Sequence, residues 1–534
     1  MFRISPSGNR PPFPPSSLAP RAPPSLEEVR VLAAIRSATL FGVEGRPVTV
    51  EVHVATGLPS FQIVGLPDEA CRESRDRVRA AVLSSGLVWP ASRVTVNLAP
   101  SSQRKGGSGL DLAIAMGLLA ASQQVHPDSV DGLGFLGEVG LDGSLRGVAG
   151  VAPMVAALGS GVRPVVPSAS AREAQGVAGD AVRVAGTLRQ LVDALNAEAP
   201  WPEPPDNDLV DDIVPLPDLA DVSGQAAART ALEVAAAGGH HLLLVGPPGS
   251  GKTMLAQRLP GLLPPLDAAI ALEATMVHSA AGVRLPPGGL VRVPPFRAPH
   301  HSSSMVSLVG GGGTTLRPGE ISLAHGGVLF LDELGEFAPV VLDGMRQPLE
   351  EGVIRLARAR ASASMPARFL LVAATNPCPC GGGPPGNCEC DEAARLRYLR
   401  RLSGPLLDRF DLRVPVHRPD VDDLLASGGG ESTALVAARV AAARQRSMDR
   451  IGMLTAHIPP AQMDALAPLD PDARALLRAE LEADRLTGRG YHRVRRVART
   501  LADLRGDELV GEANVAMALQ LRVRLRVTSR GFAA

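Results

Sequence analysis

A glycine-rich segment near the middle of the chain carries the residue types that bind nucleotide phosphates. Residues 246–253 read GPPGSGKT and fit the pattern G-x-x-x-x-G-K-[ST], between an apolar strand-like run and the helical run MLAQRL. In such a loop the backbone N–H groups surround phosphate oxygens, and the following helix N-terminus adds partial positive charge. The sequence therefore predicts an ATP site formed by Gly246, Pro247, Pro248, Gly249, Ser250, Gly251, Lys252 and Thr253.

Two side chains of this segment have separate chemical roles. Lys252 is one of two lysines in a chain with 54 lysine and arginine residues. Its compact ammonium would bind the β- and γ-phosphates as a point charge, which the planar guanidinium of arginine does not reproduce. The hydroxyl of Thr253 would be a ligand of Mg²⁺.

Polar side chains end the next two apolar runs of the chain. Asp332 and Glu333 close GVLFLDEL at 327–334, where Asp332 would hold Mg²⁺ through water and Glu333 would polarise the attacking water. Asn376 ends FLLVAATN at 369–376 and would orient that water near the γ-phosphate. A surface acidic pair and an ordinary turn asparagine are the alternative interpretations.

Several arginines are candidates to complete the site. Arg409 lies in the segment 403–411, which follows a predicted helix, and could reach the nucleotide of a neighbouring subunit. Arg489 opens a C-terminal helix and could fold over the same phosphates, with Arg493 and Arg496 as alternatives. Between the second and third apolar runs, a predicted hairpin within 349–368 bears Arg355, Arg358 and Arg360, for which a solvated charged face is the simpler interpretation.

Four of the five cysteines form the cluster C-P-C-x₇-C-E-C, at Cys378, Cys380, Cys388 and Cys390. Four thiolates within 13 residues suit tetrahedral Zn²⁺. The C-x-C spacing is less usual than C-x₂-C, so reduced thiols on a loop remain the alternative. We interpret His300, His301 and His325 as polar loop residues near nucleotide or DNA rather than as further ligands.

The apolar runs also predict the elements that position these residues. Short buried strands separated by helical stretches indicate a parallel, doubly wound sheet, and strands mixed with helices before it indicate a separate α/β domain. A Pro- and Asp-rich stretch reads as a linker, and the chain becomes helical after SGGGES. We expect a disordered Pro-rich tail at 1–30, an α/β domain at 31–199, a linker at 200–222, a nucleotide-binding domain at 223–425 and an all-α domain at 426–534.

The composition excludes several classes of protein. The 534 residues include 54 acidic and 54 basic side chains, so no global basic field attracts nucleic acid, although a local basic surface remains open. Aromatic residues make up 3%, which argues against base-stacking platforms. No run of 18 apolar residues and no signal region is present, and the cysteines are not spread as in disulfide scaffolds. We expect a reduced, cytoplasmic protein without membrane contact.

The motifs in combination resemble the ComM/YifB family of magnesium-chelatase-like AAA+ ATPases, from about residue 31 to the C-terminus. The segments that carry the resemblance lie at 40–82, 296–312, 318–337, 374–381, 402–412 and 490–504. The resemblance implies a Lon-protease-like N-terminal α/β domain, a AAA+ P-loop module and a helical lid, assembled as a homohexamer with nucleotide between subunits. It implies ATP and Mg²⁺ as cofactors and branched or single-stranded DNA as the partner.

The resemblance also implies a function and residue roles. The function is DNA branch migration, a helicase activity in the recombination of incoming DNA during natural transformation. A magnesium-chelatase-type motor that drives metal insertion into a porphyrin is the alternative, against which the Lon-like domain argues. The implied roles are Walker A for Lys252 and Thr253, Walker B for Asp332 and Glu333, sensor-1 for Asn376, arginine finger for Arg409, sensor-2 for Arg489 and pore-facing DNA contact for Arg355, Arg358 and Arg360.

The N-terminal domain departs from Lon proteases where their Ser–Lys pair would lie. Aligning 106–116 by its helix places Asp111 at the serine position, and aligning 148–157 places Ala152 at the lysine position. An alanine cannot activate a nucleophile, so we expect a protease fold without protease chemistry. Beside this region, Lys105 lies in a glycine-rich loop that would either hold a DNA phosphate or be plainly solvated.

Overall fold

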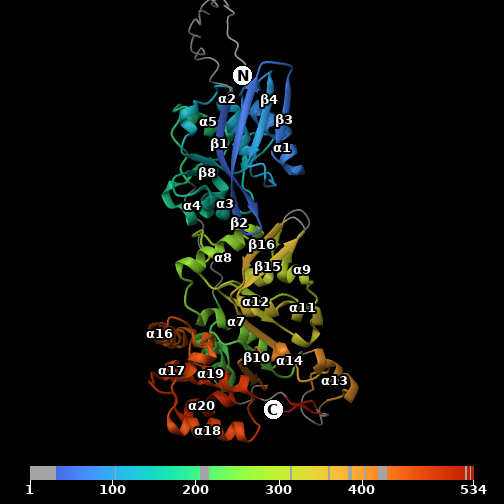
Figure 1. The fold of residues 1–534 in the computed structure, drawn as a ribbon, viewed down its shortest axis with the longest axis vertical. Helices are drawn as coiled ribbons and strands as arrows, with labels where there is room; N and C mark the ends of the chain where they lie inside the picture. The colour runs from blue at the N-terminus through green and yellow to red at the C-terminus, as the bar shows by residue number, and fades with distance from the viewer. Residues whose placement is uncertain are drawn as a thin grey trace, which may run out of the picture.

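The chain forms three stacked parts in the computed structural model, with the N-terminal domain at one end and the helical C-terminal domain at the other (Figure 1). The expected Pro-rich tail at 1–30 lies outside the described residues. The structure describes residues 32–102, 104–204, 216–312, 316–358, 361–382, 388–401, 404–418, 430–523, 526–528 and 531–533. Within these ranges, no helix is long and apolar enough to cross a membrane.

The N-terminal domain is a seven-stranded mixed sheet in the order β3-β4-β2-β1-β5-β8-β9. The strands are β1 (Leu32–Phe41), β2 (Glu44–Ala55), β3 (Ser60–Val64), β4 (Arg93–Ala99), β5 (Leu133–Phe135), β8 (Arg163–Pro167) and β9 (Arg183–Ala185), with a small ladder of β6 (Glu138–Val139) and β7 (Leu145–Arg146). The helices are α1 (Glu69–Ser84), α2 (Asp111–Ala121), α3 (Val151–Leu158), α4 (Ala171–Ala178) and α5 (Leu188–Leu195).

Residue patterns explain the core of this domain. Strand β2 alternates buried Val48, Val50 and Val52 with more exposed residues, because one face of the sheet covers the core. Helix α2 is apolar all round and is buried along its whole length against β1, β2 and α1. The mixture of strands and helices predicted before the central sheet is confirmed.

The central domain contains a five-stranded parallel sheet in the order β11-β14-β17-β10-β18. Alternate residues of its strands enter two different cores: Leu242 and Leu244 face α6 and α7, whereas Leu243 faces the opposite layer with α8. The strands are β10 (Leu242–Val245), β11 (Phe296–Arg297), β14 (Val328–Leu331), β17 (Leu370–Thr375) and β18 (Leu412–Pro415). Because both faces are covered, the prediction of a doubly wound parallel sheet is confirmed.

Helices and small ladders surround this sheet. The helices are α6 (Ala226–Gly238), α7 (Lys252–Leu262), α8 (Ala268–Ala281), α9 (Met305–Val309), α10 (Glu320–Leu323), α11 (Pro339–Gly344), α12 (Arg346–Glu351), α13 (Glu392–Arg401) and α14 (Gly404–Leu407). A two-residue ladder joins β12 (Gly310–Gly311) to β13 (Arg317–Pro318). The predicted hairpin forms from β15 (Val353–Arg358) and β16 (Ala361–Pro366), and its Ile354 and Met365 share a core with Val43 of the N-terminal domain.

The C-terminal domain is mainly helical. Its helices are α16 (Thr433–Ile451), α17 (Met463–Leu466), α18 (Pro471–Glu482), α19 (Gly488–Arg505) and α20 (Glu512–Gln520). A short hairpin of β19 (Arg526–Thr528) and β20 (Gly531–Ala533) follows, which the all-α expectation did not include. Helices α16 and α19 pack against α6, so the domain is joined to the central one by an apolar core.

The expected linker at 200–222 extends too far at its C-terminal end. Leu219 and Val222 are buried in the core of the central domain, and the N–H of Leu219 donates to the hydroxyl of Thr433 at 2.7 Å. The proline and aspartate residues that suggest a linker therefore flank apolar positions that pack. Residues 205–215 of the expected linker lie outside the described residues.

Candidate functional site

The glycine-rich segment lies where the parallel sheet predicts it, at the carboxyl end of β10. Val245 pairs with Thr375 of β17, so the segment is adjacent to the residues that follow that strand. Gly249 and Gly251 have φ angles of 72° and 86°, in the left-handed region that favours glycine. The loop borders a cavity of about 730 Å³, which is also lined by Asp221, Val222, Ser223, Gln225, Asp332, Glu333, Thr375 and Asn376.

Lys252 is held in place by oxygen acceptors. Its Nζ donates to the carbonyl oxygens of Gly246 and Pro247 at 2.8 Å each and to Oδ1 of Asn376 at 3.2 Å. Burial lowers the pKa of Lys252, and the charges of the acidic pair oppose this change. Among the described residues, the hydroxyl of Ser250 is buried without a hydrogen-bond partner. The segment therefore holds an ammonium at the border of the cavity, whereas the Ser250 hydroxyl is buried close to Gly246.

The hydroxyl and carboxylate that suit Mg²⁺ lie side by side. Oγ1 of Thr253 donates to Oδ2 of Asp332 at 2.7 Å, although the two residues are 79 positions apart in the chain. Oδ1 of Asp332 also accepts from the N–H of Glu333 at 2.9 Å. Hydroxyl and carboxylate oxygens are the hard donors that Mg²⁺ takes together with phosphate oxygens, so this donor pair fits a Mg²⁺–nucleotide.

Glu333 has an unusual backbone conformation and a partner that the sequence analysis did not assign to it. Its φ is 51°, a left-handed value that is uncommon for a residue other than glycine. Nδ1 of His301 lies 3.0 Å from Oε2 of Glu333, and the rings of His300 and His301 are 4.1 Å apart. Both histidines follow β11, the edge strand beside β14, and this adjacency of strand ends is the signal that would have placed them here.

A smaller cavity continues from this acidic pair. It has a volume of about 300 Å³ and shares Thr253, Asp332 and Glu333 with the larger cavity. His300 and His301 line its other side. The two histidines are therefore next to the predicted catalytic carboxylate. His325, which the sequence grouped with them, is instead buried, and its Nε2 lies 2.9 Å from Oε2 of Glu273.

The four clustered cysteines come together beside the same site. Their sulfur atoms all lie within 4.8 Å of one another, with separations of 3.4 Å between Cys378 and Cys380 and 3.7 Å between Cys380 and Cys388. Tetrahedral Zn²⁺ with Zn–S bonds of about 2.3 Å would place sulfur atoms about 3.8 Å apart. Gly381 approaches Pro248 so closely that a Cβ on it would lie 2.5 Å from that ring, so the cluster packs against the phosphate-binding loop.

Arg409 lies at the opposite edge of the sheet from the glycine-rich segment of its own chain. It precedes β18, whereas the segment follows the parallel strand β10, and the four residues of β18 span about 13 Å. The Arg409 side chain is 21% exposed and pairs with Glu350. Arg489 lies on this same side, with its Nη1 3.6 Å from Oδ2 of Asp408.

Comparison with known proteins shows how far this arrangement is shared. Residues 218–424 match the family described as magnesium chelatase, subunit ChlI; residues 50–169 match subunit ChlI of Mg-chelatase; and residues 430–522 match the ChlI C-terminal family. The competence protein ComM of Haemophilus influenzae is 42% identical over 511 residues, 93% of this chain and 99% of its own length.

This chain belongs to the ComM/YifB family of magnesium-chelatase-like proteins. YifB of Escherichia coli is 41% identical over 493 residues, 92% of this chain and 97% of its own. An uncharacterized protein of Mycobacterium tuberculosis is 46% identical over 497 residues, 91% of this chain and 97% of its own. The predicted resemblance is confirmed, and it includes the AAA+ arrangement of the central domain.

The two alternatives to Arg489 are half-buried and hydrogen-bonded within the chain. Arg493 donates to the carbonyl oxygen of Arg409 at 3.2 Å and to the carboxylate of Asp411. Arg496 donates to the carbonyl oxygen of Ile458 at 2.9 and 2.6 Å. Of the three candidates, only Arg489 has a largely exposed side chain, at 82%. Arg489 is therefore the one of these three arginines whose guanidinium is open to solvent.

The candidate DNA contacts differ in their exposure to solvent. Arg355 is exposed on β15 and pairs with Glu351, one of the acidic neighbours that the solvated-face interpretation requires. The Arg358 side chain and all of Arg360 lie outside the described residues. The assignment of Lys105 to a DNA contact is wrong, because Lys105 is fully buried and its Nζ donates to the carbonyl oxygen of Pro100.

The Lon-like region of this ComM/YifB protein has no Ser–Lys pair at the aligned positions. Asp111 is buried and accepts from Nε of Arg77 at 2.7 Å. The N–H of Ala152 donates to Oε1 of Glu173 at 2.8 Å and to Oγ of Ser279 at 3.2 Å. Ser279 belongs to α8 of the central domain, so the start of α3 is a junction between domains.

Proposed function

We propose that this ComM/YifB protein is an ATP-driven ring motor that acts on branched or single-stranded DNA, as a branch-migration helicase in recombination of incoming DNA during natural transformation. The observation that carries the motor proposal is the position of Arg409 at the sheet edge opposite its own phosphate-binding loop. An arginine there reaches a nucleotide only across an interface with a second copy of the chain. In a homohexamer with nucleotide between subunits, one subunit would supply the phosphate-binding loop and its neighbour would supply Arg409. The similarity to the competence protein ComM supports DNA as the molecule on which the motor acts.

The residues of the site divide the work of phosphate transfer to water. ATP with Mg²⁺ supplies the phosphoanhydride bond whose hydrolysis drives the motor. Lys252, which borders the cavity, would bind the terminal phosphates, and the adjacent Thr253 and Asp332 would hold the metal ion. Glu333 accepts the proton of the attacking water, and Asn376, fixed by Lys252, orients that water.

DNA is expected to raise the ATPase rate of the full chain, and this measurement separates the proposal from its rival. The family descriptions name magnesium chelatase, so metal insertion into a porphyrin is the second candidate. ATP turnover is measured with forked DNA, a four-way junction, single-stranded DNA or a porphyrin acceptor. Stimulation by forked or four-way DNA supports the proposal. Stimulation by the porphyrin with no response to any DNA would refute it.

Arg355→Ala tests the hairpin through DNA affinity measured across salt concentrations. If Arg355 contacts a phosphate in every subunit of the ring, the variant weakens DNA binding and lowers the slope of log affinity against log salt, because fewer counterions are released. A slope equal to that of the unaltered protein would favour the interpretation of a solvated charged face, in which Arg355 forms an ion pair with Glu351 and does not contact DNA.

We also propose that the four clustered cysteines hold one structural Zn²⁺ in this protein. Their donor set is all thiolate, and their sulfur separations match a tetrahedral site closely. The cluster follows Asn376 by two residues and packs on the phosphate-binding loop through Gly381. A bound ion would therefore brace the loop that carries the sensor residue.

One zinc per chain is expected in protein purified without chelator, and the double variant Cys388→Ser/Cys390→Ser is expected to lose it. Metal content is measured by inductively coupled plasma mass spectrometry together with thiol titration. Cys71→Ser is the matched control, because Cys71 is buried in the N-terminal domain away from the cluster. Four freely titrating cluster thiols with no zinc, even after zinc is added, would mean that the cluster is a reduced loop.

A further inference from the structure

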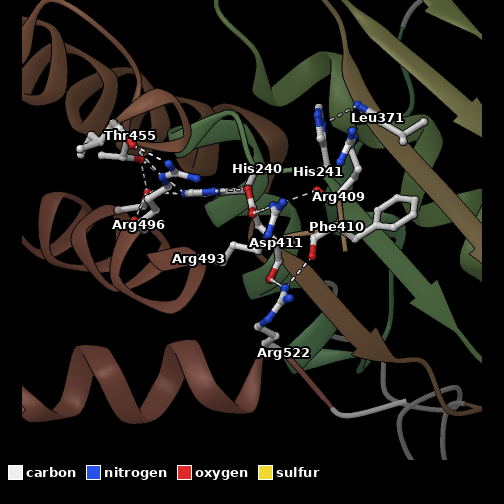
Figure 2. Close-up of polar contacts among 12 residues, drawn as sticks. His240, His241, Leu371, Arg409, Phe410, Asp411, Thr455, Arg493, Arg496 and Arg522 are labelled. Atoms are coloured by element: carbon white, nitrogen blue, oxygen red, sulfur yellow. Dashed lines mark hydrogen bonds and ion pairs between the residues drawn. The ribbon is translucent and has the colours of Figure 1, made fainter. Parts of the chain in front are cut away.

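Residues 409–411, the segment that carries Arg409, are hydrogen-bonded to the C-terminal domain through all three of their carbonyl groups. Arg493 of α19 donates to the carbonyl oxygen of Arg409 at 3.2 Å. Arg522, just beyond α20, donates to the carbonyl oxygens of Phe410 at 2.5 Å and Asp411 at 2.8 Å. Figure 2 shows both guanidinium groups directed at this segment from the helical side. Three consecutive backbone positions thus depend on two side chains of another domain.

Asp411 is the centre of this contact (Figure 2). It is 4% exposed, and its carboxylate accepts from Arg493 through Oδ1 and lies 3.1 Å from Nδ1 of His240 through Oδ2. His240 precedes β10, the strand that leads into the phosphate-binding loop. Its Nε2 lies 2.7 Å from the hydroxyl of Thr500 on α19, which also contacts the hydroxyl of Thr455. The carboxylate therefore links the Arg409 segment, the central strand and the C-terminal helices.

The charge of Asp411 is stabilised in this setting. Burial by itself would raise the pKa of the carboxyl group, but the hydrogen bond and charge of His240 and the charge of Arg493 outweigh it. The pKa of Asp411 is consequently held well below its usual range, so the group is ionised at any physiological pH. The donors around a buried, ionised carboxylate must keep their positions, because each donor that moves away leaves part of the negative charge uncompensated.

We propose that Asp411 is a positioning residue for Arg409, and that Arg493 acts through Asp411 rather than on nucleotide directly. The inference rests on the proposed role of Arg409 at a neighbouring subunit's nucleotide. The Arg409 guanidinium itself pairs only with the exposed Glu350 among the side chains the structure describes, so the direction of the side chain is set mainly by its backbone. That backbone is held by both domains: the N–H of Asp411 donates to the carbonyl oxygen of His241 at 3.1 Å, and the carbonyl oxygens of the segment accept from Arg493 and Arg522. The position of the C-terminal domain is therefore a determinant of hydrolysis in the next subunit.

Asp411→Asn is expected to lower ATP turnover of the assembled ring by about 10²-fold, the scale of a 1 Å misplacement of a catalytic group. Nucleotide binding to the chain is expected to be unchanged, because the phosphate-binding loop lies at the other edge of the sheet. Asp449→Asn, on the exposed face of α16, is the matched control and is expected to retain full turnover. Thermal unfolding and ring assembly are measured for each variant.

Mixed rings give the readout that a loss of folding would not produce. Asp411→Asn and Lys252→Ala subunits are expected to restore turnover together, because one kind of interface then joins an intact loop to a correctly held Arg409. Asp411→Asn and Arg409→Ala subunits are expected not to restore it, since both lack the same side of the interface. Mixed composition is confirmed by native mass spectrometry.

Each outcome of this design bears on one proposal. If Arg409→Ala keeps its turnover, the proposed interfacial role of Arg409 fails. If Arg409→Ala loses turnover while Asp411→Asn keeps it, or if Asp411→Asn fails to recover with Lys252→Ala, the positioning role is overturned and the role of Arg409 stands. Should Asp411→Asn not fold, Arg493→Lys replaces it and must show the same recovery. If Arg493 instead sensed the nucleotide of its own subunit, mixed rings of Arg493→Lys and Lys252→Ala subunits would not regain turnover.

Discussion

Glu333→Gln is expected to bind ATP and barely hydrolyse it, with turnover reduced by about 10²–10⁴-fold, the usual contribution of a positioned general base. The carboxylate follows the buried strand β14 and borders the same cavity as the phosphate-binding loop. Glutamine keeps the shape of the side chain and its hydrogen bond to His301 but cannot accept the proton of water. Phosphate release and binding of a fluorescent ATP analogue are measured on the same preparation.

Two further variants make this result specific. Lys252→Ala is expected to lose turnover together with affinity, because the ammonium that faces the phosphates is removed. Glu336→Gln changes an exposed carboxylate three residues from Glu333 and should leave the rate unchanged. Turnover near that of the unaltered protein in Glu333→Gln would contradict the catalytic role of this carboxylate.

Arg409→Ala is expected to lower hydrolysis in the assembled ring by about 10³–10⁵-fold, the range found when an arginine is supplied to a phosphoryl-transfer site from another subunit. Isolated subunits are expected to bind nucleotide normally, since Arg409 is remote from the loop of its own chain. Turnover is therefore lost while nucleotide binding is retained, whereas a change that destabilises the fold would reduce both. Turnover is measured across protein concentrations that span ring assembly.

Subunit mixing tests the direction of this contribution. Rings that contain both Arg409→Ala and Lys252→Ala subunits should regain part of the activity, because some interfaces then hold an intact arginine and an intact loop. Arg478→Ala, an exposed arginine on α18, is the matched control for loss of one positive charge. No recovery at any ratio in verified mixed rings would show that Arg409 doesn't act across an interface.

Much of the candidate nucleotide site could be predicted because its determinants are local. The segment at 246–253 combines glycines that permit left-handed φ angles with a lysine and a threonine at fixed spacing. Asp332 and Asn376 each end an apolar run, and parallel strands bring their carboxyl ends to one edge of a sheet. Strand type and direction were thus sufficient to bring residues more than 100 positions apart to one cavity.

Side-chain partners were decided by tertiary packing. The sequence suggests that Lys105 is an exposed residue of a glycine-rich loop. In the structure its ammonium is buried and donates to the carbonyl oxygen of Pro100. His301 reads as a loop residue, and only the pairing of β11 with β14 places it on Glu333. Composition and spacing contain no information about which carbonyl or carboxylate will lie within 3 Å of a given side chain.

The sequence by itself predicted the glycine-rich segment with its phosphate chemistry, the parallel sheet and the family, because residue type and short-range spacing dictate local backbone conformation and strand type. Only the tertiary structure decided which edge of the sheet Arg409 occupies and which of Arg489, Arg493 and Arg496 remains exposed. One helix displays all three arginines, and helical periodicity shows that they point in different directions without showing what each one meets. The buried carboxylate of Asp411 takes Arg493 out of solvent, because an ionised group in the interior requires a charged partner.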